Sequence, residues 1–328
     1  MNDTVPRIFV VGSYMHAFVL RAPRFPQDGE TVFGTDSEIG PGGKGSNQAI
    51  AAARLGAAVD LLACVGDDAF GSEARRLWQD EGLNGRLIHV DPDRATGMAF
   101  IIVDETGQNR IIVTPGANDM LSAHHADLAE DAIASAGVLI AQFEAPLEVV
   151  RGALQLARRH GVRTILNPAP VRQVTDDLLA LVDIVTPNES EAQTLAGASD
   201  GSFDPERVGR ALQARGIETV VLTLGDAGAY ILDGAGGRHV PGVHAAVVDT
   251  TGAGDAFTGA LAVALARGQS LDDAVGFANL GGAYCVTRPG VVPGLGAERD
   301  LLAIQAPAAD QPVHSGGSRG CPPRGHNE

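Results

Sequence analysis

The sequence Asp249-Thr250-Thr251-Gly252-Ala253-Gly254-Asp255-Ala256-Phe257-Thr258-Gly259-Ala260-Leu261 joins a β-like run at Ala245–Val248 to an apolar helix predicted over Ala256–Ala266. The two glycines at 252 and 254 permit a tight turn between these elements. The N–H groups of such a turn, together with the dipole of the helix that follows, form a site for an anion. A strand, a glycine turn and a helix in this order are typical of the α/β fold class.

Asp255 stands at the start of this predicted helix and has two interpretations. An acidic residue there is often an N-cap or a first-turn charge that favours the helix dipole. A carboxylate placed directly on an anion-binding turn, however, would repel the anion. This conflict favours the second interpretation, in which Asp255 is a catalytic base beside a phosphoryl group.

Short β-like runs alternate with helix-like segments along the rest of the chain. The β-like runs are Ile8–Val11, Val59–Val65, Val138–Ile140, Thr164–Leu166, Ile184–Val185 and Val220–Leu224. The helix-like segments include Ser46–Leu55, Ser72–Glu81, Leu147–Arg159 and Pro205–Arg215. This alternation predicts an α/β fold with a doubly wound, mostly parallel sheet that is covered by helices on both faces.

Two pairs of β-like runs break the alternation and predict a small β lid over the active site. They are His16–Leu20 with Glu30–Phe33, and Met98–Val103 with Arg110–Val113, the second pair flanking a polar turn at Asp104–Asn109. We therefore expect one domain over residues 1–305, with lid strands from about 14–40 and 96–115. Residues 306–328 carry almost no apolar periodicity and are predicted to be a disordered tail.

Composition excludes several classes of protein. The 328 residues include 24 Lys and Arg against 40 Asp and Glu, a net charge of -16, which argues against binding to nucleic acid. The longest apolar runs are far shorter than a membrane span, and Met1–Arg7 carries no secretory signal. Cys64, Cys285 and Cys321 form no CxxC pair, so we expect neither a disulfide framework nor a thiolate zinc site. A cytoplasmic enzyme of small molecules, without nucleic-acid or membrane partners, fits best.

A second glycine-rich stretch, Gly40-Pro41-Gly42-Gly43-Lys44-Gly45-Ser46-Asn47-Gln48, leads into an alanine-rich helix. It is no Walker A loop, because Gly45 stands where Ser or Thr should bind magnesium. It also follows an irregular strand, unlike a dinucleotide fingerprint. The stretch could be only a tight strand-to-helix turn, or it could hold a polar ligand. Lys44 and Asn47 favour the ligand.

Taken together, the two glycine-rich stretches resemble the paired signatures of the ribokinase family of sugar kinases. Further segments resemble that family in the same order along the chain. They are Ala141-Gln142-Phe143-Glu144, Asn167-Pro168-Ala169-Pro170, Thr186-Pro187-Asn188-Glu189-Ser190-Glu191, Thr223-Leu224-Gly225-Asp226-Ala227-Gly228, Asn279, and Val286-Thr287-Arg288-Pro289-Gly290. The resemblance covers about residues 7 to 295.

The resemblance implies an ATP-dependent kinase that transfers the γ-phosphate to the primary hydroxyl of a pentose, ribose in this family, with ribose 5-phosphate as the product. In that case Asp255 takes the proton of the hydroxyl. The N–H groups of Gly252, Ala253 and Gly254 hold the charge on the transferred phosphoryl group. The implied sugar contacts are Met15, Gly42, Gly43, Lys44, Asn47, Glu144 and Asp255.

The resemblance also implies the nucleotide and cation sites. Its nucleotide-binding residues are Asn188, Thr223, Gly225, Gly228, Gly254 and Asn279. Glu191 orients Mg²⁺, largely through water, although Asn188 and Glu191 could equally be a helix capping box. A potassium site would use Asp249, Thr251, Cys285, Arg288 and Gly290. Gly294 stands where the family has a serine ligand.

The sequence departs from the family near the N-terminus. After Gly12-Ser13 the family places an Asn and an Asp that bond the sugar hydroxyls, and here Met15 and Ala17 stand in their positions. A methionine at the first position resembles the branch that phosphorylates 2-deoxyribose. The alternatives are therefore a 2-deoxyribose kinase or a nucleoside kinase of the same family, or a silent sugar- or nucleotide-binding protein. The intact sequence from Gly252 to Asp255 argues against the silent protein.

The lid strands also predict the state of assembly. Their apolar residues alternate, and a lid cannot bury both its faces within one subunit. Two lids paired across a two-fold axis would cover them, so we expect a homodimer.

Overall fold

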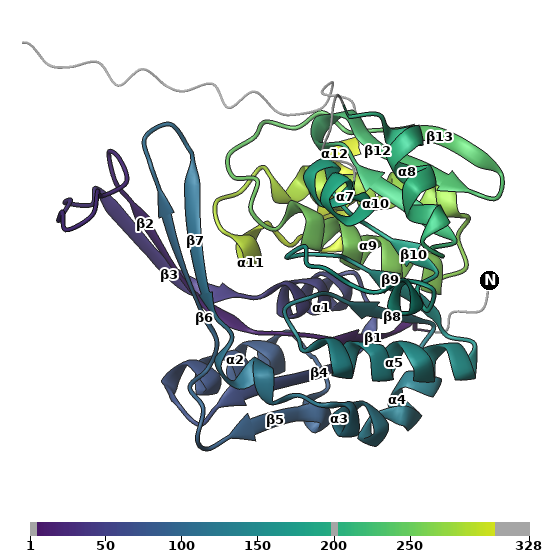
Figure 1. The fold of residues 1–328 in the computed structure, drawn as a ribbon, viewed down its shortest axis with the longest axis horizontal. Coiled ribbons are helices and arrows are strands. Elements are labelled where there is room, and N and C mark those ends of the chain that lie inside the picture. Colours follow the sequence, from purple (N-terminus) through teal and green to yellow (C-terminus); the bar gives the residue numbers. More distant parts are fainter. Residues whose placement is uncertain (1–4, 198–202, 306–328) are drawn as a thin grey trace, which may run out of the picture.

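The computed structural model describes residues 5–197 and 203–305, and the predicted tail at 306–328 lies outside them. The described residues form a large sheet between two layers of helices, and a small sheet that projects from this body (Figure 1). The two sheets meet near the start of helix α1 (Lys44–Arg54), which is where the glycine-rich stretches lie.

The large sheet has nine strands among the described residues. From β1 the chain first adds β4 and β5 on one side of the sheet and then adds β8 to β13 on the other side. From one edge to the other the strands are β13 (Gly236–Pro241), β12 (Gly228–Asp233), β11 (Thr219–Thr223), β10 (Ile184–Val185), β9 (Arg163–Leu166), β8 (Val138–Ala141), β1 (Arg7–Val11), β4 (Ala58–Gly66) and β5 (Ile88–Asp91). All neighbours from β11 to β5 pair in parallel. The predicted doubly wound, mostly parallel sheet is confirmed.

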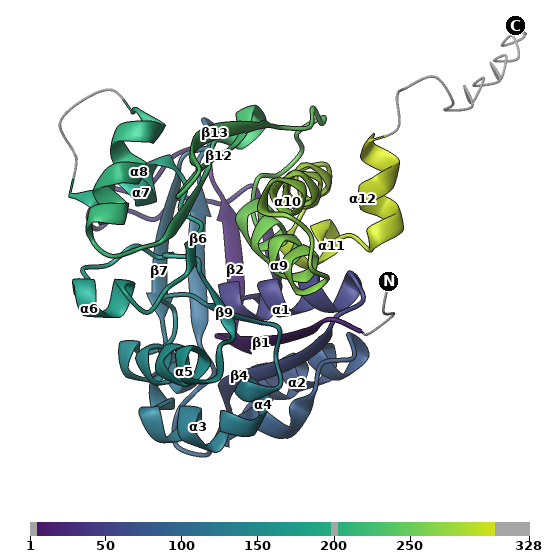
Figure 2. The same cartoon turned by 90° about the vertical axis from the view of Figure 1, so that its right-hand side faces the viewer.

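The parallel strands are apolar on both faces because each face packs against helices. In β1, Ile8 and Val10 point into one core and Phe9 and Val11 into the other, and all four side chains are buried. The helices over the first core are α1, α2 (Ala69–Asp80), α9 (Ala253–Ala266), α10 (Leu271–Cys285) and α12 (Glu298–Gln305). Figure 2 shows α9, α10 and α12 close together on this side.

The second core lies under a run of helices from the middle of the chain. They are α3 (Ala123–Leu128), α4 (Glu130–Ala134), α5 (Leu147–His160), α6 (Asp176–Leu179), α7 (Glu189–Ala196) and α8 (Pro205–Ala214). Four short helical turns complete the described elements: η1 (Gly85–Leu87), η2 (Gly116–Met120), η3 (Gly225–Ala227) and α11 (Val291–Gly294). No helix within residues 5–197 and 203–305 is long and apolar enough to cross a membrane.

The small sheet has the order β3-β2-β6-β7 and forms the predicted lid. Its strands are β2 (Met15–Arg21), β3 (Asp36–Gly42), β6 (Met98–Val103) and β7 (Asn109–Thr114). Strands β2 and β6 pair in parallel, and the two outer pairs are antiparallel. The predicted strand at Glu30–Phe33 is wrong, because these residues belong to the connection between β2 and β3. The true strand, Asp-Ser-Glu-Ile-Gly-Pro-Gly, has poor β propensity and forms by pairing with β2.

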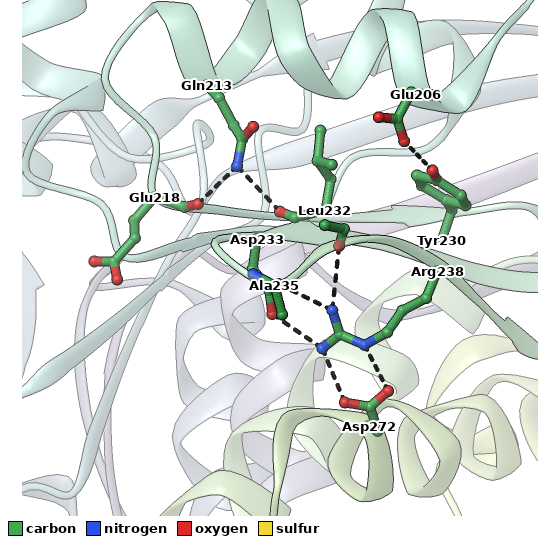
Figure 3. Close-up of polar contacts among 10 residues, drawn as sticks. Glu206, Gln213, Glu218, Tyr230, Leu232, Asp233, Ala235, Arg238 and Asp272 are labelled. Carbon is green, nitrogen blue, oxygen red and sulfur yellow. Dashed lines mark hydrogen bonds and ion pairs between the residues drawn. The ribbon is translucent and has the colours of Figure 1, made fainter.

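The predicted strand at Ala245–Val248 is also wrong. Residues 245–248 form no strand, and Val247 and Val248 are exposed. Helix α9 begins at Ala253, three residues before the predicted start, because Gly252 adopts the left-handed conformation directly before it. The edge of the sheet is instead an antiparallel hairpin of β12 and β13. Figure 3 shows Arg238 of β13 paired with both Asp233 and Asp272, so this hairpin is tied to α10.

Candidate active site

A cavity of about 200 Å³ lies at the carboxyl ends of the central strands, where α/β proteins commonly bind ligands. Residues from both glycine-rich stretches, from the segments after β9 and β10, and from the last position of β11 line it. They are Lys44, Asn167, Ala169, Thr186, Asn188, Glu191, Thr223, Thr250, Gly252, Gly254 and Asp255. Residues predicted to be catalytic, to contact the sugar and to bind the nucleotide therefore share one cavity.

The turn before α9 has the glycine geometry that an anion site needs. Gly252 has φ 84, and a Cβ atom there would lie 2.6 Å from Cγ1 of Val291, so no other residue fits without movement. A Cβ atom at Gly254 would meet no atom within 4 Å, because Gly254 faces the open cavity. A ligand can thus approach the backbone at the N-terminus of α9 closely.

Asp255 projects from the first turn of α9 and is 6 % exposed. Each of its carboxylate oxygens accepts an N–H from α1: Nδ2 of Asn47 donates to Oδ2 at 2.8 Å, and Nε2 of Gln48 donates to Oδ1 at 2.9 Å. As an isolated N-cap, Asp255 would bond the backbone of its own helix, and α9 has no side-chain cap bond. This carboxylate is held by another helix and faces the cavity.

The stretch from Gly40 to Gln48 forms a tight turn, and its Lys44 lines the cavity. The predicted sugar contacts beside it, Met15, Gly42, Gly43, Lys44, Asn47 and Glu144, are together called the sugar wall. Gly43 has φ 94, and a Cβ atom there would lie 2.8 Å from the Met15 nitrogen. Gly42 pairs with Met15 in the register of β2 and β3, so the two candidate sugar contacts are neighbours. Met15 is buried, and its sulfur lies 3.8 Å from Nδ2 of Asn118.

Glu144 joins this wall from the loop after β8. Its Oε2 accepts the Ser13 hydroxyl at 2.6 Å and the backbone N–H of Lys44 at 2.8 Å. Burial raises the pKa of Glu144, against the opposing effect of these two donors and of the Lys44 charge. Burial alone would lower the pKa of Lys44, but the carboxylates of Asp255, Glu144 and Glu191 outweigh it and raise that pKa. Lys44 therefore stays cationic among three carboxyl groups.

Asn188 and Glu191 form the capping box, which was one of their two interpretations. Asn188 caps α7 by accepting the Glu191 N–H at 2.9 Å, and Glu191 Oε2 accepts the Asn188 N–H at 3.0 Å, which is a capping box. Both side chains also line the cavity. The capping box fixes where they point, and a carboxylate with an open side is a suitable oxygen ligand for Mg²⁺.

The predicted nucleotide residues form a strip that leads away from the cavity. Thr223 lines the cavity, and Gly225 and Gly228 bound the turn that follows β11. Gly228 has φ 99 and packs against Gly242, whose N–H bonds the Ala227 carbonyl. Asn279 of α10 does not line the cavity and donates to the Pro241 carbonyl at 3.0 Å.

The predicted cation ligands also come together. Asp249 accepts the N–H groups of Thr251 at 2.9 Å and Gly290 at 3.0 Å. Cys285 lies 3.5 Å from the Thr251 carbonyl. Burial raises the pKa of Cys285 to about 12, with the Asp255 and Asp249 charges adding to it, so this thiol stays protonated. The guanidinium of Arg288 lies over the Tyr284 ring instead, 3.9 Å from its centroid.

Reasoning from the sequence missed several polar residues of the site. Gln48, Gln142 and Asn167 are buried and joined by hydrogen bonds directly behind Asp255. All three stand inside segments already singled out. The signal that could have found them is an uncharged amide next to apolar residues, because a buried amide needs partners.

A family model described as pfkB family carbohydrate kinase matches residues 5–296. The chain is 37% identical to a ribokinase of Haemophilus influenzae over 294 residues, covering 89% of this chain and 96% of the relative. It is 34% identical to a deoxyribokinase of Salmonella typhi over 285 residues, covering 86% of this chain and 93% of the relative. The fold matches the structure of Arabidopsis thaliana ribokinase complexed with ribose and ATP with a TM-score of 0.83 and 28% identity, covering 92% of this chain and 99% of that one.

Proposed function

Because the chain belongs to the pfkB family of carbohydrate kinases and is an ATP-dependent sugar kinase, we propose that it phosphorylates the primary hydroxyl of ribose and releases ribose 5-phosphate. Similarity to ribokinases over most of the chain supports a pentose as the substrate. The observation that carries the assignment to this site is Asp255, a buried carboxylate in the first turn of α9 that Nδ2 of Asn47 holds by a hydrogen bond.

In the proposed reaction Asp255 is the general base. It accepts the proton of the sugar hydroxyl while that oxygen attacks the γ-phosphorus in line, and ADP leaves. The backbone N–H groups of Gly252, Ala253 and Gly254 stabilise the charge that develops on the transferred group. Lys44, Asn47 and Glu144, with the backbone of Gly42 and Gly43, position the sugar. Thr223, Gly225, Gly228, Asn188 and Asn279 lie along the nucleotide.

The donor groups of the cavity fit Mg²⁺. Asp255 and Glu191 place two carboxylates in a cavity with one cation, Lys44, so a bare triphosphate would meet net negative charge. Glu191 would hold the ion, largely through water, together with the phosphate oxygens. When bound, Mg²⁺ neutralises phosphate charge.

The proposed site for K⁺ lies behind the turn at Gly252. Asp249 and the backbone carbonyl groups around Thr251, Cys285, Arg288 and Gly290 are oxygen donors of the kind that alkali cations prefer. A side chain at Gly294 would not fit without movement, because a Cβ atom there would lie 2.9 Å from the Cys285 sulfur. The chain would thus hold the ion without a side-chain oxygen from position 294.

A 2-deoxyribose kinase is the second candidate, and Met15 favours it. This apolar side chain borders Gly42 at the sugar wall and offers no hydrogen bond to a ring hydroxyl. A sugar that lacks one hydroxyl therefore loses less binding free energy there than ribose does, because it buries no unpaired hydroxyl. The similarity to the Salmonella typhi deoxyribokinase is consistent with this candidate.

The working enzyme is proposed to be a cytoplasmic homodimer. All six residues of β7 are exposed, among them Ile111 and Ile112, and Ile39 of β3 is exposed as well. Pairing of two lids would remove this apolar surface from water. The cysteines at 64 and 285 are buried free thiols, which suits a reducing compartment.

The test is a phosphotransfer assay with ATP and Mg²⁺ against ribose, 2-deoxyribose, a hexose and a nucleoside, with the product located by ³¹P and ¹³C NMR. We expect the highest kcat/KM with ribose or 2-deoxyribose and the phosphate on O5. A preference for the nucleoside or the hexose, or no transfer to any acceptor, would overturn the proposal.

A further inference from the structure

Behind Asp255 the structure holds a chain of buried amides that the reaction described above does not use. Nε2 of Gln142 donates to Oε1 of Gln48 at 2.6 Å, and Nε2 of Gln48 donates both to Oδ1 of Asp255 at 2.9 Å and to Oδ1 of Asn167 at 3.2 Å. Nδ2 of Asn167 donates to the backbone carbonyl of Thr186 at 3.0 Å. The side chains of Gln48, Gln142, Asn167 and Asp255 come from four separate segments, and those of Gln48 and Gln142 are fully buried.

The direction of these bonds follows from one fixed acceptor. An amide has a donor end and an acceptor end, and a backbone carbonyl can only accept. The Thr186 carbonyl therefore takes the donor end of Asn167, which turns the Asn167 oxygen toward Gln48. Gln48 must then present its nitrogen to Asn167, and the same nitrogen reaches Asp255. Its oxygen is left facing Gln142.

Oε1 of Gln142 has no hydrogen-bond partner among the described residues, so Gln142 follows the orientation of Gln48. Reversal of Gln48 is excluded at the other end, where it would place the Gln48 oxygen against the oxygens of Asp255 and Asn167. In a buried site such contacts cost the desolvation of each unpaired group. The Thr186 carbonyl, through Asn167, thus determines that the nitrogen of Gln48 and not its oxygen faces the carboxylate of Asp255.

We propose that Gln48, oriented by Asn167 and held by Gln142, is a positioning residue that holds the carboxylate plane of Asp255 in the geometry for proton transfer. This proposal rests on the proposed kinase function. Asn47 donates to the other oxygen from the sugar wall, so Gln48 is the donor from the protein interior. Gln48 takes no proton itself: the proton passes from the sugar hydroxyl to Asp255 alone.

Asn47 and Gln48 have distinct roles in this arrangement. Oδ1 of Asn47 is buried and has no hydrogen-bond partner among the described residues, so it is free to accept a hydroxyl of the sugar. The side-chain nitrogen and oxygen of Gln48 form all their hydrogen bonds with protein groups. Loss of Asn47 should therefore change both KM for the sugar and kcat, whereas loss of Gln48 should change kcat alone.

The test compares Gln48→Met, Gln142→Met and the double variant by steady-state kinetics. A misplaced base commonly costs about 10²-fold in rate, so Gln48→Met should lower kcat by about 10- to 100-fold with both KM values changed less than about threefold. Gln142→Met removes the donor to Oε1 of Gln48, so the Gln48 side chain is held less firmly, and kcat should fall by a similar factor. If Gln142 acts through Gln48, adding Gln142→Met to Gln48→Met should cost little more.

Ser46→Ala is the matched control. Ser46 lies on the same helix, is buried, and accepts the indole N–H of Trp78 at 2.8 Å without contacting Asp255. We expect this variant to lower the melting temperature while kcat stays within about twofold of the wild type, since a lost buried hydrogen bond costs stability. If Ser46→Ala loses as much kcat as Gln48→Met, the effect is structural and the proposal is wrong.

Two further results would overturn the proposal. One is a folded Gln48→Met enzyme with unchanged kcat, and the other is losses for Gln48→Met and Gln142→Met that simply multiply in the double variant. If Gln48→Met does not fold, Gln142→Met decides alone, and unchanged kcat in that variant counts against the proposal. A wild-type protein that phosphorylates no sugar would instead contradict the proposed function, so the two failures are distinguishable.

Discussion

The side-chain nitrogen of Asn47 lies 2.8 Å from Oδ2 of Asp255, although 208 positions separate the two residues along the chain. This bond joins the first turn of α1 to the first turn of α9, the two helices that begin at the glycine-rich stretches. In the proposed reaction, a sugar bound by Asn47 would therefore lie next to Asp255. Proximity of this kind can account for a large share of the rate of a bimolecular transfer.

Replacement of Asp255 by asparagine tests its role as the base. Asp255→Asn keeps the size of the side chain but removes the proton acceptor, so we expect turnover to fall by about 10²–10⁴-fold. The fold and the binding of ATP should stay nearly intact, as measured by circular dichroism and isothermal titration calorimetry. Near-normal turnover in this variant would mean that Asp255 only stabilises α9.

The first strand of the sheet and most of the residues that line the cavity could be predicted from the sequence, because each depends on local pattern. The apolar run at Ile8–Val11 predicts a buried strand by itself. Strand β3 could not be predicted, because Asp36–Gly42 becomes a strand only when Met15–Arg21 of β2 lies beside it. Glu30–Phe33 has the better local pattern and yet remains a loop.

The same limit applies to the site. Asp255 and the glycines of its turn carry a local signature of residue type and spacing. Gln48 was visible in the sequence, but its role depends on Gln142 and Asn167, which lie 94 and 119 positions away. A network assembled from four segments has no period and no fixed spacing. Only the fold brings its members together.

The exposed apolar surface of the lid predicts the effect of a charge on assembly. Ile112 in β7 is 68 % exposed, and Ile112→Asp would put a carboxylate into the proposed contact between two lids. We expect the wild type to be a dimer and this variant a monomer in multi-angle light scattering. Leu128→Asp, at an exposed position on α3 outside the lid, is the control and should stay dimeric. A wild-type monomer mass at all concentrations would contradict the assembly.

His16 at the base of the lid predicts how stability depends on pH. Its ring is buried and stacks on Phe70 with 4.0 Å between centroids. Burial lowers the pKa of His16 from its ordinary value of 6.5, although the charges of Glu73 and Asp68 oppose this. As the pH falls, His16 is therefore protonated in the unfolded chain before it is protonated in the folded one. The contribution of neutral His16 to the free energy of unfolding is fully present above pH 6.5 and is lost as the pH falls below that value.

His16→Phe removes this titration and keeps an aromatic ring against Phe70. The free energy of unfolding, measured in urea between about pH 7 and about pH 5, should therefore fall less steeply in the variant than in the wild type. His244→Asn is the control, because the exposed His244 meets water in both the folded and the unfolded chain. Equal slopes for His16→Phe and the wild type would show that protonation of His16 is not coupled to folding.

Met15 and Ala17 predict the choice between ribose and 2-deoxyribose. Substitution by Asn and Asp would supply about two hydrogen bonds to ring hydroxyls, each contributing about 0.5–1.5 kcal/mol. Position 17 lies beside Gly42, which has no side chain, and the Met15 sulfur already lies 3.8 Å from the polar Nδ2 of Asn118. The variant Met15→Asn with Ala17→Asp should therefore favour ribose.

The measurement is the ratio of kcat/KM for 2-deoxyribose to that for ribose, which should be lower in the double variant than in the wild type by about 10-fold. Met15→Leu is the control: it keeps an apolar side chain at the same position, so its ratio should match the wild type. The sign of the change separates two causes. A general loosening of the site would lower kcat/KM for both sugars. New partners for ring hydroxyls would instead raise kcat/KM more for ribose than for 2-deoxyribose, because 2-deoxyribose lacks the hydroxyl at C2. An unchanged ratio would mean that Met15 and Ala17 lie outside the sugar pocket, and it would remove the structural argument for 2-deoxyribose.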